Sequence, residues 1–203
     1  MALTALVIYA VWALLAFGLR TWVQWRRTGD TGFRGTGFRR GTVQWWARIL
    51  FIAALLAVAA GPVAELLGLS PVDALDRQAV HIGGLATAML GVAATLAAQV
   101  SMGASWRIGV DEDERTTLVT GGAFALARNP IFTAMITTAV GLAAMVPNLV
   151  SLAGLVLTVG SIEMQVRAVE EPYLRRVHGE AYIRYAARVG RFLPGIGRDR
   201  TPA

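Results

Sequence analysis

Residues 80–100, VHIGGLATAMLGVAATLAAQV, decide the fold class of this 203-residue chain. The stretch contains no aspartate, glutamate, lysine or arginine, and its apolar residues are not confined to one helical face. A helix needs roughly 20 consecutive apolar residues to cross the hydrocarbon core of a bilayer. We therefore expect a transmembrane helix here.

Four further apolar blocks cover residues 2–19, 49–64, 131–146 and 149–162. The last two are shorter than a full span and are separated only by Pro147 and Asn148, a pair typical of a tight turn. They indicate a hairpin of two short spanning helices that take in flanking residues, or a re-entrant hairpin. Of these we expect the spanning pair. The sequence thus predicts an all-α polytopic membrane protein with about five transmembrane helices.

Composition supports the membrane assignment. The chain is 55% hydrophobic and only 16% charged, whereas about a quarter of the residues of a soluble domain are charged. The absence of cysteine excludes disulfides, thiolate metal sites and cysteine nucleophiles. All the basic residues are arginine, a usage that, with the many alanines and glycines, is typical of a GC-rich bacterial genome. The expected location is the cell inner membrane.

The arginines predict the orientation. Eighteen of the nineteen lie in residues 20–48, in residues 101–129 or after residue 162, and only Arg77 lies in another connection. Arginine excess marks the cytoplasmic face, so the N-terminus is expected outside and the C-terminus inside. The same topology explains the net charge of +6 without a nucleic-acid partner. The repeat GFRGTGFR (residues 32–39) resembles RNA-binding sequence, but is better interpreted as a loop that contacts anionic head groups.

One candidate site surrounds GGAFALARNPIF (residues 121–132). Pro130 suits the first position of a helix, and Asn129 suits the cap before it. Such a helix start, beside Arg128, is a binding site for an anion such as a carboxylate. The alternative is an ordinary capped helix next to an arginine that only marks topology.

A second candidate site follows the last apolar block. Glu163, Glu170 and Glu171 lie close to the end of a membrane helix, where acidic side chains are costly unless hydrated or paired. One of them could accept hydrogen bonds from a ribose or an ammonium group. Equally, they could form a charge-paired, solvated helix with Arg128, Arg167 or Arg175. Tyr182 and Tyr185 share one helical face further on.

Other kinds of site are not expected. The two histidines, His81 and His178, are far apart in the sequence, which argues against a metal site or a Ser/His/Asp triad. No glycine-rich nucleotide-binding fingerprint is present.

Taken together, the polar motifs resemble the isoprenylcysteine carboxyl methyltransferase and phospholipid methyltransferase superfamily. The matching segments, in order, are LVTGGAF (residues 118–124), RNPIF (128–132), EEPYL (170–174) and GEAYIRY (179–185). Asn129 stands where the family has histidine, and Phe124 and Phe132 stand where it has tyrosine. Arg167 lies one position after the expected arginine.

The resemblance implies that the cytoplasmic C-terminal helical region binds a cofactor, S-adenosylmethionine, and no metal is expected. The expected cofactor-binding residues are Thr116, Thr117, Leu118, Val119, Phe124, Arg128, Asn129, Pro130, Ile131, Phe132, Glu170 and Tyr185. Catalytic roles are expected for Arg167 and Glu171. The implied domains are residues 1–100, three transmembrane helices; residues 101–194, the methyltransferase core; and residues 195–203, a tail.

The function expected from the resemblance is S-adenosylmethionine-dependent methylation of a membrane-embedded amphiphile. The acceptor is a prenylcysteine-like carboxylate or a lipid that enters sideways from the bilayer. One alternative is a membrane reductase of similar architecture that uses a nicotinamide cofactor, although the chain is short for it. Another is a scaffold or transporter without enzymatic activity, which would need more polar residues inside its helices. The sequence specifies neither the acceptor nor the oligomeric state.

Overall fold

The computed structural model describes residues 1–34, 40–109 and 117–199, and within these ranges the regular elements are all helices. In chain order they include α1 (Ala2–Ala13), α2 (Arg20–Thr28), α3 (Val43–Leu66), α4 (Gln78–Met102), α5 (Pro130–Met145), α6 (Leu149–Met164), α7 (Glu171–His178) and α8 (Glu180–Arg188). Two π-helical turns, η1 (Leu14–Leu19) and η4 (Gln165–Glu170), join α1 to α2 and α6 to α7 without a break. Short 3-10 turns occur at Gly103–Ser105 and Gly122–Ala125.

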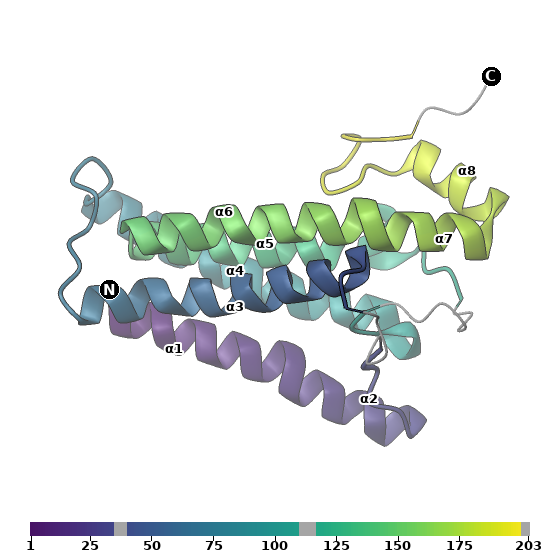
Figure 1. The fold of residues 1–203 in the computed structure, drawn as a ribbon, viewed down its shortest axis with the longest axis horizontal. Coiled ribbons are helices and arrows are strands. Elements are labelled where there is room, and N and C mark those ends of the chain that lie inside the picture. The colour runs from purple at the N-terminus through teal and green to yellow at the C-terminus, as the bar shows by residue number, and fades with distance from the viewer. Residues whose placement is uncertain (35–39, 110–116, 200–203) are drawn as a thin grey trace.

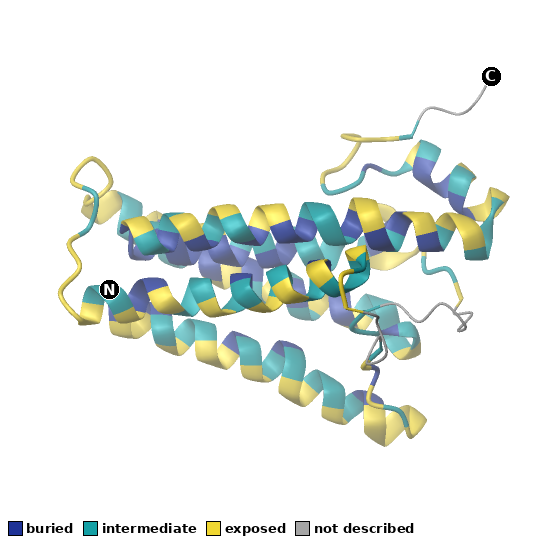
Figure 2. Ribbon diagram, viewed as in Figure 1, coloured by how far each residue is buried: buried dark blue, intermediate teal, exposed yellow. Residues whose placement is uncertain are grey.

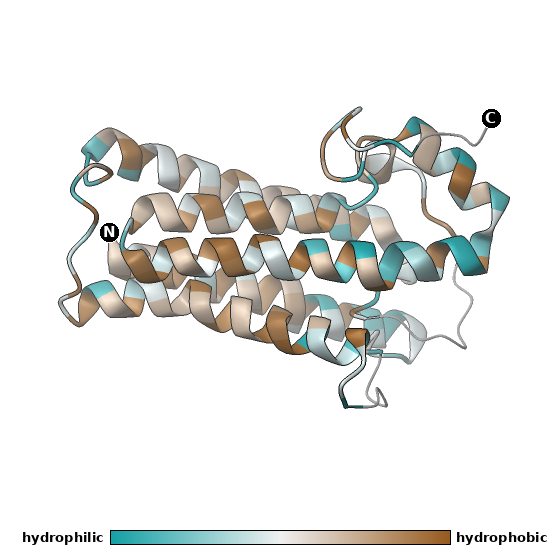
Figure 3. Ribbon diagram, turned by 45° about the horizontal axis from the view of Figure 1, so that its top comes forward, coloured by the Kyte–Doolittle hydropathy of each residue, from teal (hydrophilic) through white to brown (hydrophobic). Residues whose placement is uncertain are grey.

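Four continuous helices are long and apolar enough to cross a membrane, namely Ala2–Thr28, Val43–Leu66, Gln78–Ser105 and Leu149–His178. The fifth apolar helix, α5, is shorter. Figure 3 shows apolar colour along the bundle and hydrophilic colour gathered at the end that carries α7 and α8. The all-α polytopic fold expected from the sequence is confirmed, and the protein is an integral membrane protein.

The outer faces of the helices are apolar and exposed, which is the reverse of a soluble bundle. Leu14, Leu56, Leu90 and Val156 are among the most exposed large hydrophobic residues, and exposed and buried positions alternate along each helix (Figure 2). Lipid tails are as apolar as these side chains, so in a bilayer their exposure carries no cost.

Small residues set how closely the helices pack. α5 lies against α4, and α6 lies against α3. A Cβ atom added to Gly141 of α5 would lie 2.2 Å from the backbone nitrogen of Ala88 in α4, and one added to Gly91 would lie 2.4 Å from that of Thr138. Only glycine permits backbones to approach this closely, as is common between membrane helices.

The turn between α5 and α6 is built as the sequence indicates. The Asn148 side chain accepts a hydrogen bond from the backbone N–H of Ser151 at 2.9 Å, so it caps α6. Its Nδ2 atom donates to the carbonyl oxygen of Gly61 in α3, also at 2.9 Å. One buried asparagine therefore ends the hairpin and fixes it to a neighbouring helix.

Helix α4 is tied to the first long helix by hydrogen bonds. Trp12 Nε1 donates to Thr95 Oγ1 at 3.3 Å, and Gln99 Nε2 donates to the carbonyl oxygen of Ala16 at 2.9 Å. Nearer the end of α4, the side chains of Arg20 and Gln24 donate to the carbonyl oxygens of Gly103 and Ala104.

The polar end of the bundle, opposite the N-terminus in Figure 1, holds α7, α8 and the C-terminal segment 189–199. Gly179 separates α7 from α8 with a φ of 50°, a value that a side chain would make unfavourable. The turn folds α8 back, so that Tyr182, Tyr185 and Ala186 form a small buried core with Leu118 and Leu174. This core positions the site described next.

Candidate functional site

A cavity of about 250 Å³ lies where the helical bundle meets its polar end. This volume is of the order of small-molecule sites, which measure roughly 300–1,000 Å³. Its wall combines residues of the transmembrane helices with residues of the connections and helices that follow them. A ligand in the cavity would therefore contact both an apolar and a polar environment.

The polar part of the cavity is lined by residues from well-separated parts of the chain. The segment 117–119 and Phe124 contribute one wall, the start of α5 a second, and Glu170, Tyr182 and Tyr185 a third. The Tyr185 hydroxyl donates to the carbonyl oxygen of Phe124 at 2.6 Å. Burial raises the pKa of Tyr185 to about 12, so the hydroxyl keeps its proton and the two walls stay joined at neutral pH.

Eleven of the twelve expected cofactor-binding residues line this one cavity, and Thr116 lies outside the described residues. Those that line it are Thr117, Leu118, Val119, Phe124, Arg128, Asn129, Pro130, Ile131, Phe132, Glu170 and Tyr185. All but Thr117, which directly precedes the first motif, come from the four motifs of the resemblance, so their convergence is a property of the fold and not of sequence proximity.

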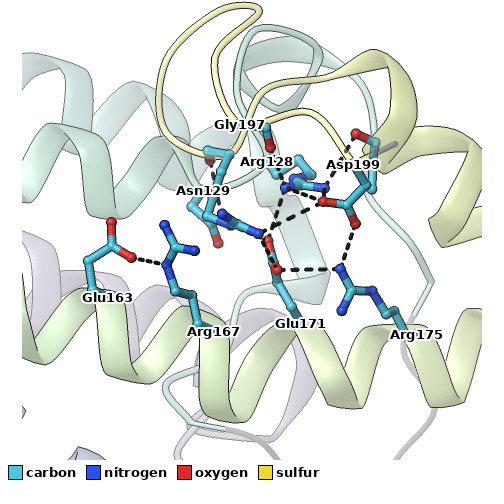
Figure 4. A network of polar contacts seen from close by, with 10 residues as sticks. Arg128, Asn129, Glu163, Arg167, Glu171, Arg175, Gly197 and Asp199 are labelled. Carbon is cyan, nitrogen blue, oxygen red and sulfur yellow. Dashed lines mark hydrogen bonds and ion pairs between the residues drawn. The ribbon is translucent and has the colours of Figure 1, made fainter. Parts of the chain in front are cut away.

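The two expected catalytic residues lie elsewhere. Arg167 does not line the cavity; its side chain is 57% exposed and forms an ion pair with Glu163, four residues earlier on the same helix (Figure 4). Glu171 is buried but also lies outside the cavity wall. Catalytic roles for these two residues stay a prediction, since neither side chain is part of the cavity wall.

Glu171 belongs to an ion cluster with Arg128, Arg175 and Asp199 (Figure 4), in which Glu171 and Arg128 are buried and Arg175 is exposed. Arg191 also pairs with Glu171. Its Oε1 atom lies 2.7 Å from Arg191 Nε and 3.1 Å from Arg128 Nη2. Asp199 is paired with Arg128 at 3.2 Å and with Arg175 at 2.5 Å. Burial pushes the pKa of Asp199 upward, but the hydrogen bond from Arg175 and the charge of Arg128 outweigh it and lower the pKa. The cluster fastens the C-terminal segment to α7 and to the start of α5.

Arg128 is engaged by the protein through both terminal nitrogens of its guanidinium, whereas its Nε atom is buried without a partner among the described residues. Its side chain is 1% exposed, and it also donates to the backbone carbonyl oxygens of Ala186 and Gly197. The sequence left open whether this arginine binds a ligand carboxylate or only marks topology. The geometry shows a third role, because the guanidinium holds the polar end together.

Asn129 precedes α5 as expected, but its side chain does not cap the helix. Within the described residues its Nδ2 atom donates to the carbonyl oxygen of Arg191 at 3.1 Å, and no capping hydrogen bond is formed. The expectation of a side-chain cap is wrong: Asn129 occupies the cap position, but its side chain hydrogen-bonds to the C-terminal segment and not to the first turn of α5. The first-turn amides of α5 are thus left without a side-chain cap at the cavity wall formed by Pro130, Ile131 and Phe132.

The membrane part of the cavity was not anticipated from the sequence. It is lined by Trp12, Ala16, Phe17, Phe51, Thr95, Gln99 and Met135. No recognisable motif covers these positions. The available signal was polarity, because Thr95 and Gln99 stand out in the apolar stretch 80–100.

Both π-helical turns also contribute to the wall, η1 through Ala16 and Phe17 and η4 through Gln165, Val169 and Glu170. Turns of this kind occur frequently at functional sites.

His178 is a second residue that sequence reasoning missed. It lines the cavity, and its Nε2 atom is buried without a hydrogen-bond partner in the described structure. Considered only as a metal ligand or as a member of a triad, it had no role. Among the described residues no group of His, Asp or Glu side chains could hold a metal ion.

Comparison with known families identifies the chain. A sequence model described as phospholipid methyltransferase matches residues 79–181, about half of the chain and nearly all of the stretch from α4 to the start of α8. The protein belongs to this family of membrane methyltransferases, which confirms the resemblance drawn from the motifs. A search among curated proteins gives no match.

Proposed function

We propose that the protein is an S-adenosylmethionine-dependent methyltransferase that acts on a membrane-embedded amphiphilic lipid. The observation that carries the proposal is the convergence of four separated motifs on one cavity. One part of this cavity is lined by polar residues and the other part by apolar residues of the membrane helices. The family match supports the reaction class. The cavity supports the pairing of a soluble cofactor with a lipid.

The residues of the polar part fit this cofactor. Glu170 accepts one hydrogen bond, from Gln165 Nε2 at 3.1 Å, and a carboxylate can accept several more. It suits ribose hydroxyls or an ammonium group. The unpartnered Nε2 atom of His178 is a further polar contact, and the rings of Phe124, Phe132 and Tyr185 suit an adenine or a sulfonium cation.

The start of α5 is the proposed place for the cofactor's carboxylate. First-turn amides and the positive end of the helix dipole bind anions, and at α5 no Asn129 side chain competes for them. Arg128 acts mainly indirectly, because the two terminal nitrogens of its guanidinium are used in the ion cluster and position this helix start, and only its Nε atom is left without a partner among the described residues.

When bound, the cofactor supplies an electrophilic methyl group, so the protein mainly has to align the acceptor and exclude water. A carboxylate acceptor would need no base. An amine acceptor would have to lose a proton, and of Glu163, Glu170 and Glu171 only Glu170 lines the cavity. We assign it this role if the acceptor is an amine.

The two parts of the cavity are built by different parts of the chain and would bind different parts of the ligands. Residues 1–100 supply most of the membrane part, where an acyl or prenyl tail would lie, and residues 101–194 supply most of the polar part. The arginine distribution favours a cytoplasmic position for the polar end, and the cytoplasm is the compartment that holds the cofactor. The lipid would enter between the helices from the bilayer.

The direct test is transfer of labelled methyl groups. Purified protein in lipid bilayers, given methyl-labelled S-adenosylmethionine and a bacterial membrane lipid extract, should place label in the lipid fraction. Heat-inactivated protein serves as the control. Oxidation of a reduced nicotinamide cofactor without methyl label in any lipid would instead support the reductase alternative.

A further inference from the structure

Gln99 carries an unused hydrogen-bond acceptor in the membrane part of the cavity. The side chain lines the cavity and is only 3% exposed. Its Nε2 atom donates to the carbonyl oxygen of Ala16 at 2.9 Å, while its Oε1 atom has no partner among the described residues. Because a carbonyl oxygen can only accept, the amide orientation is fixed and Oε1 is the free atom.

A buried acceptor without a hydrogen-bond partner costs folding free energy, so its presence in the cavity wall points to a ligand that pairs with it. A buried polar atom without a partner destabilises the fold, and such atoms are few in native proteins. Apolar residues such as Phe17, Phe51 and Met135 also line this part of the cavity. The nearby hydroxyl of Thr95 is already engaged, since it donates to Gly91 and accepts from Trp12.

A second buried glutamine, Gln24, shows that a glutamine can link two segments by a hydrogen bond without leaving its Oε1 atom unpaired. Gln24 also donates to a backbone carbonyl oxygen, that of Ala104, at 2.9 Å. Its Oε1 atom, however, accepts a hydrogen bond from Arg20 at 3.2 Å, and the residue does not line the cavity. Of the two glutamines, only Gln99 has an unpaired acceptor atom, and only Gln99 lines the cavity.

The depth of Gln99 indicates what part of a lipid it would meet. It lies three residues before the last residue of α4, Met102, and therefore about 4.5 Å along the helix axis from that end. A lipid whose head group lies in the polar part of the cavity would present the junction of its head group and tails at this level.

We propose that Gln99 is a specificity-determining residue whose Oε1 atom accepts a hydrogen bond from an N–H or O–H group of the lipid substrate. The inference rests on the proposed function of the cavity as a lipid-binding site. Because Oε1 can only accept, it disfavours a substrate whose group at this position is also only an acceptor, such as a carboxylate or an ester. The substrate class is an amphiphile with a hydroxyl or an amine at the junction of head group and tail.

The test compares three single-chain glycerophospholipids, titrated without cofactor into the purified protein. All three have a trimethylammonium head: the first has a free glycerol hydroxyl, the second is its methyl ether, and the third carries a primary amine in place of that hydroxyl. The first and third thus each add one type of donor to the second. Each lipid is titrated into the wild type, Gln99→Met and the matched control Gln24→Met.

We expect the wild type to bind the hydroxyl or the amine lipid about three- to tenfold more tightly than the donor-free ether, as one net hydrogen bond allows. Gln99→Met should bind all three alike, and Gln24→Met should keep the wild-type preference. The lipid that is preferred identifies the donor as O–H or N–H.

Equal affinity of the wild type for all three lipids would overturn the proposal without recourse to any variant. So would a preference that survives in Gln99→Met, or one that Gln24→Met loses to the same extent. Because cofactor is absent, a failure of S-adenosylmethionine binding would count against the proposed function and leave this result intact.

Discussion

At the scale of single residues, Arg128 joins the start of α5 to α7 and to the C-terminal segment. Lysine at this position would keep the charge, but a compact ammonium cannot reproduce the fork that contacts Glu171 and Asp199 together. Arg128→Lys should therefore destabilise the protein without cofactor by about 2 kcal/mol, somewhat less than the loss of a buried ion pair. The measurement is thermal unfolding of detergent-purified protein.

Arg167→Lys is the control, because its ion pair with Glu163 is exposed and such pairs contribute little. Its melting temperature should match that of the wild type. If Arg128→Lys also melted like the wild type but bound S-adenosylmethionine weakly, the cluster would be dispensable and Arg128 would be a cofactor ligand after all.

Glu170 is the carboxylate that we place against the cofactor. Glu170→Gln keeps the shape and removes the charge, so the fold should survive while cofactor affinity falls roughly tenfold to a hundredfold, as expected for a hydrogen bond worth about 1.5–3 kcal/mol. Equilibrium binding checks this, with Glu163→Gln, which lies outside the cavity, as control. Unchanged affinity in Glu170→Gln would remove Glu170 from the site.

Residues within recognisable motifs could be placed in a cavity from the sequence, whereas residues outside them could not. Phe124 and Tyr185 each belong to a motif of the resemblance, and they meet in the structure. Gln99 and His178 line the same cavity, but nothing in their local sequence indicates which helices they face. Arg128 was recognised as important but not in its role, because its partner Asp199 lies 71 residues away.

At the scale of helices, the sequence did not predict where the helix that begins in the last apolar block ends. The sequence predicts a short helix over residues 149–162, but the helix continues through η4 and α7 to His178. Two features sustain it, namely the pairing of Glu163 with Arg167 four residues on and the burial of Val166 and Val169. The flanking residues therefore complete the span, and the π-helical turn within them has no sequence signature.

The packing of α5 on α4 gives a prediction of its own. An alanine at Gly141 would place its Cβ atom against the backbone of Ala88 and Gly84, which cannot yield as a flexible side chain would. Gly141→Ala should destabilise the protein by about 1–3 kcal/mol, the usual cost of overpacking. Chemical or thermal unfolding in detergent provides the measurement.

Gly160 of α6 is the matched control, since nothing lies within 4 Å of an added Cβ atom there. Gly160→Ala should be neutral or stabilising by up to about 1 kcal/mol, because alanine is the better helix former. Equal effects of the two substitutions would mean that α4 and α5 do not pack as closely as described.

At the scale of the whole molecule, the apolar bundle and its polar end predict one orientation. A reporter fused after Ala203 should be active only in a cytoplasmic form, and one inserted near Asp73, between α3 and α4, only in a periplasmic form. The physical reason is the arginine excess at the polar end. The opposite pattern of activity would place the cavity's polar part in a compartment without cofactor.

The claim on which the rest depends is that the cavity binds S-adenosylmethionine. Calorimetric titration of the detergent-purified protein with S-adenosylmethionine, with its demethylated product and with a reduced nicotinamide cofactor tests this most directly. We predict saturable binding of the first two at one site per chain, competition between them, and no binding of the third. Binding of the nicotinamide cofactor, with none of S-adenosylmethionine or its product, would contradict the assignment.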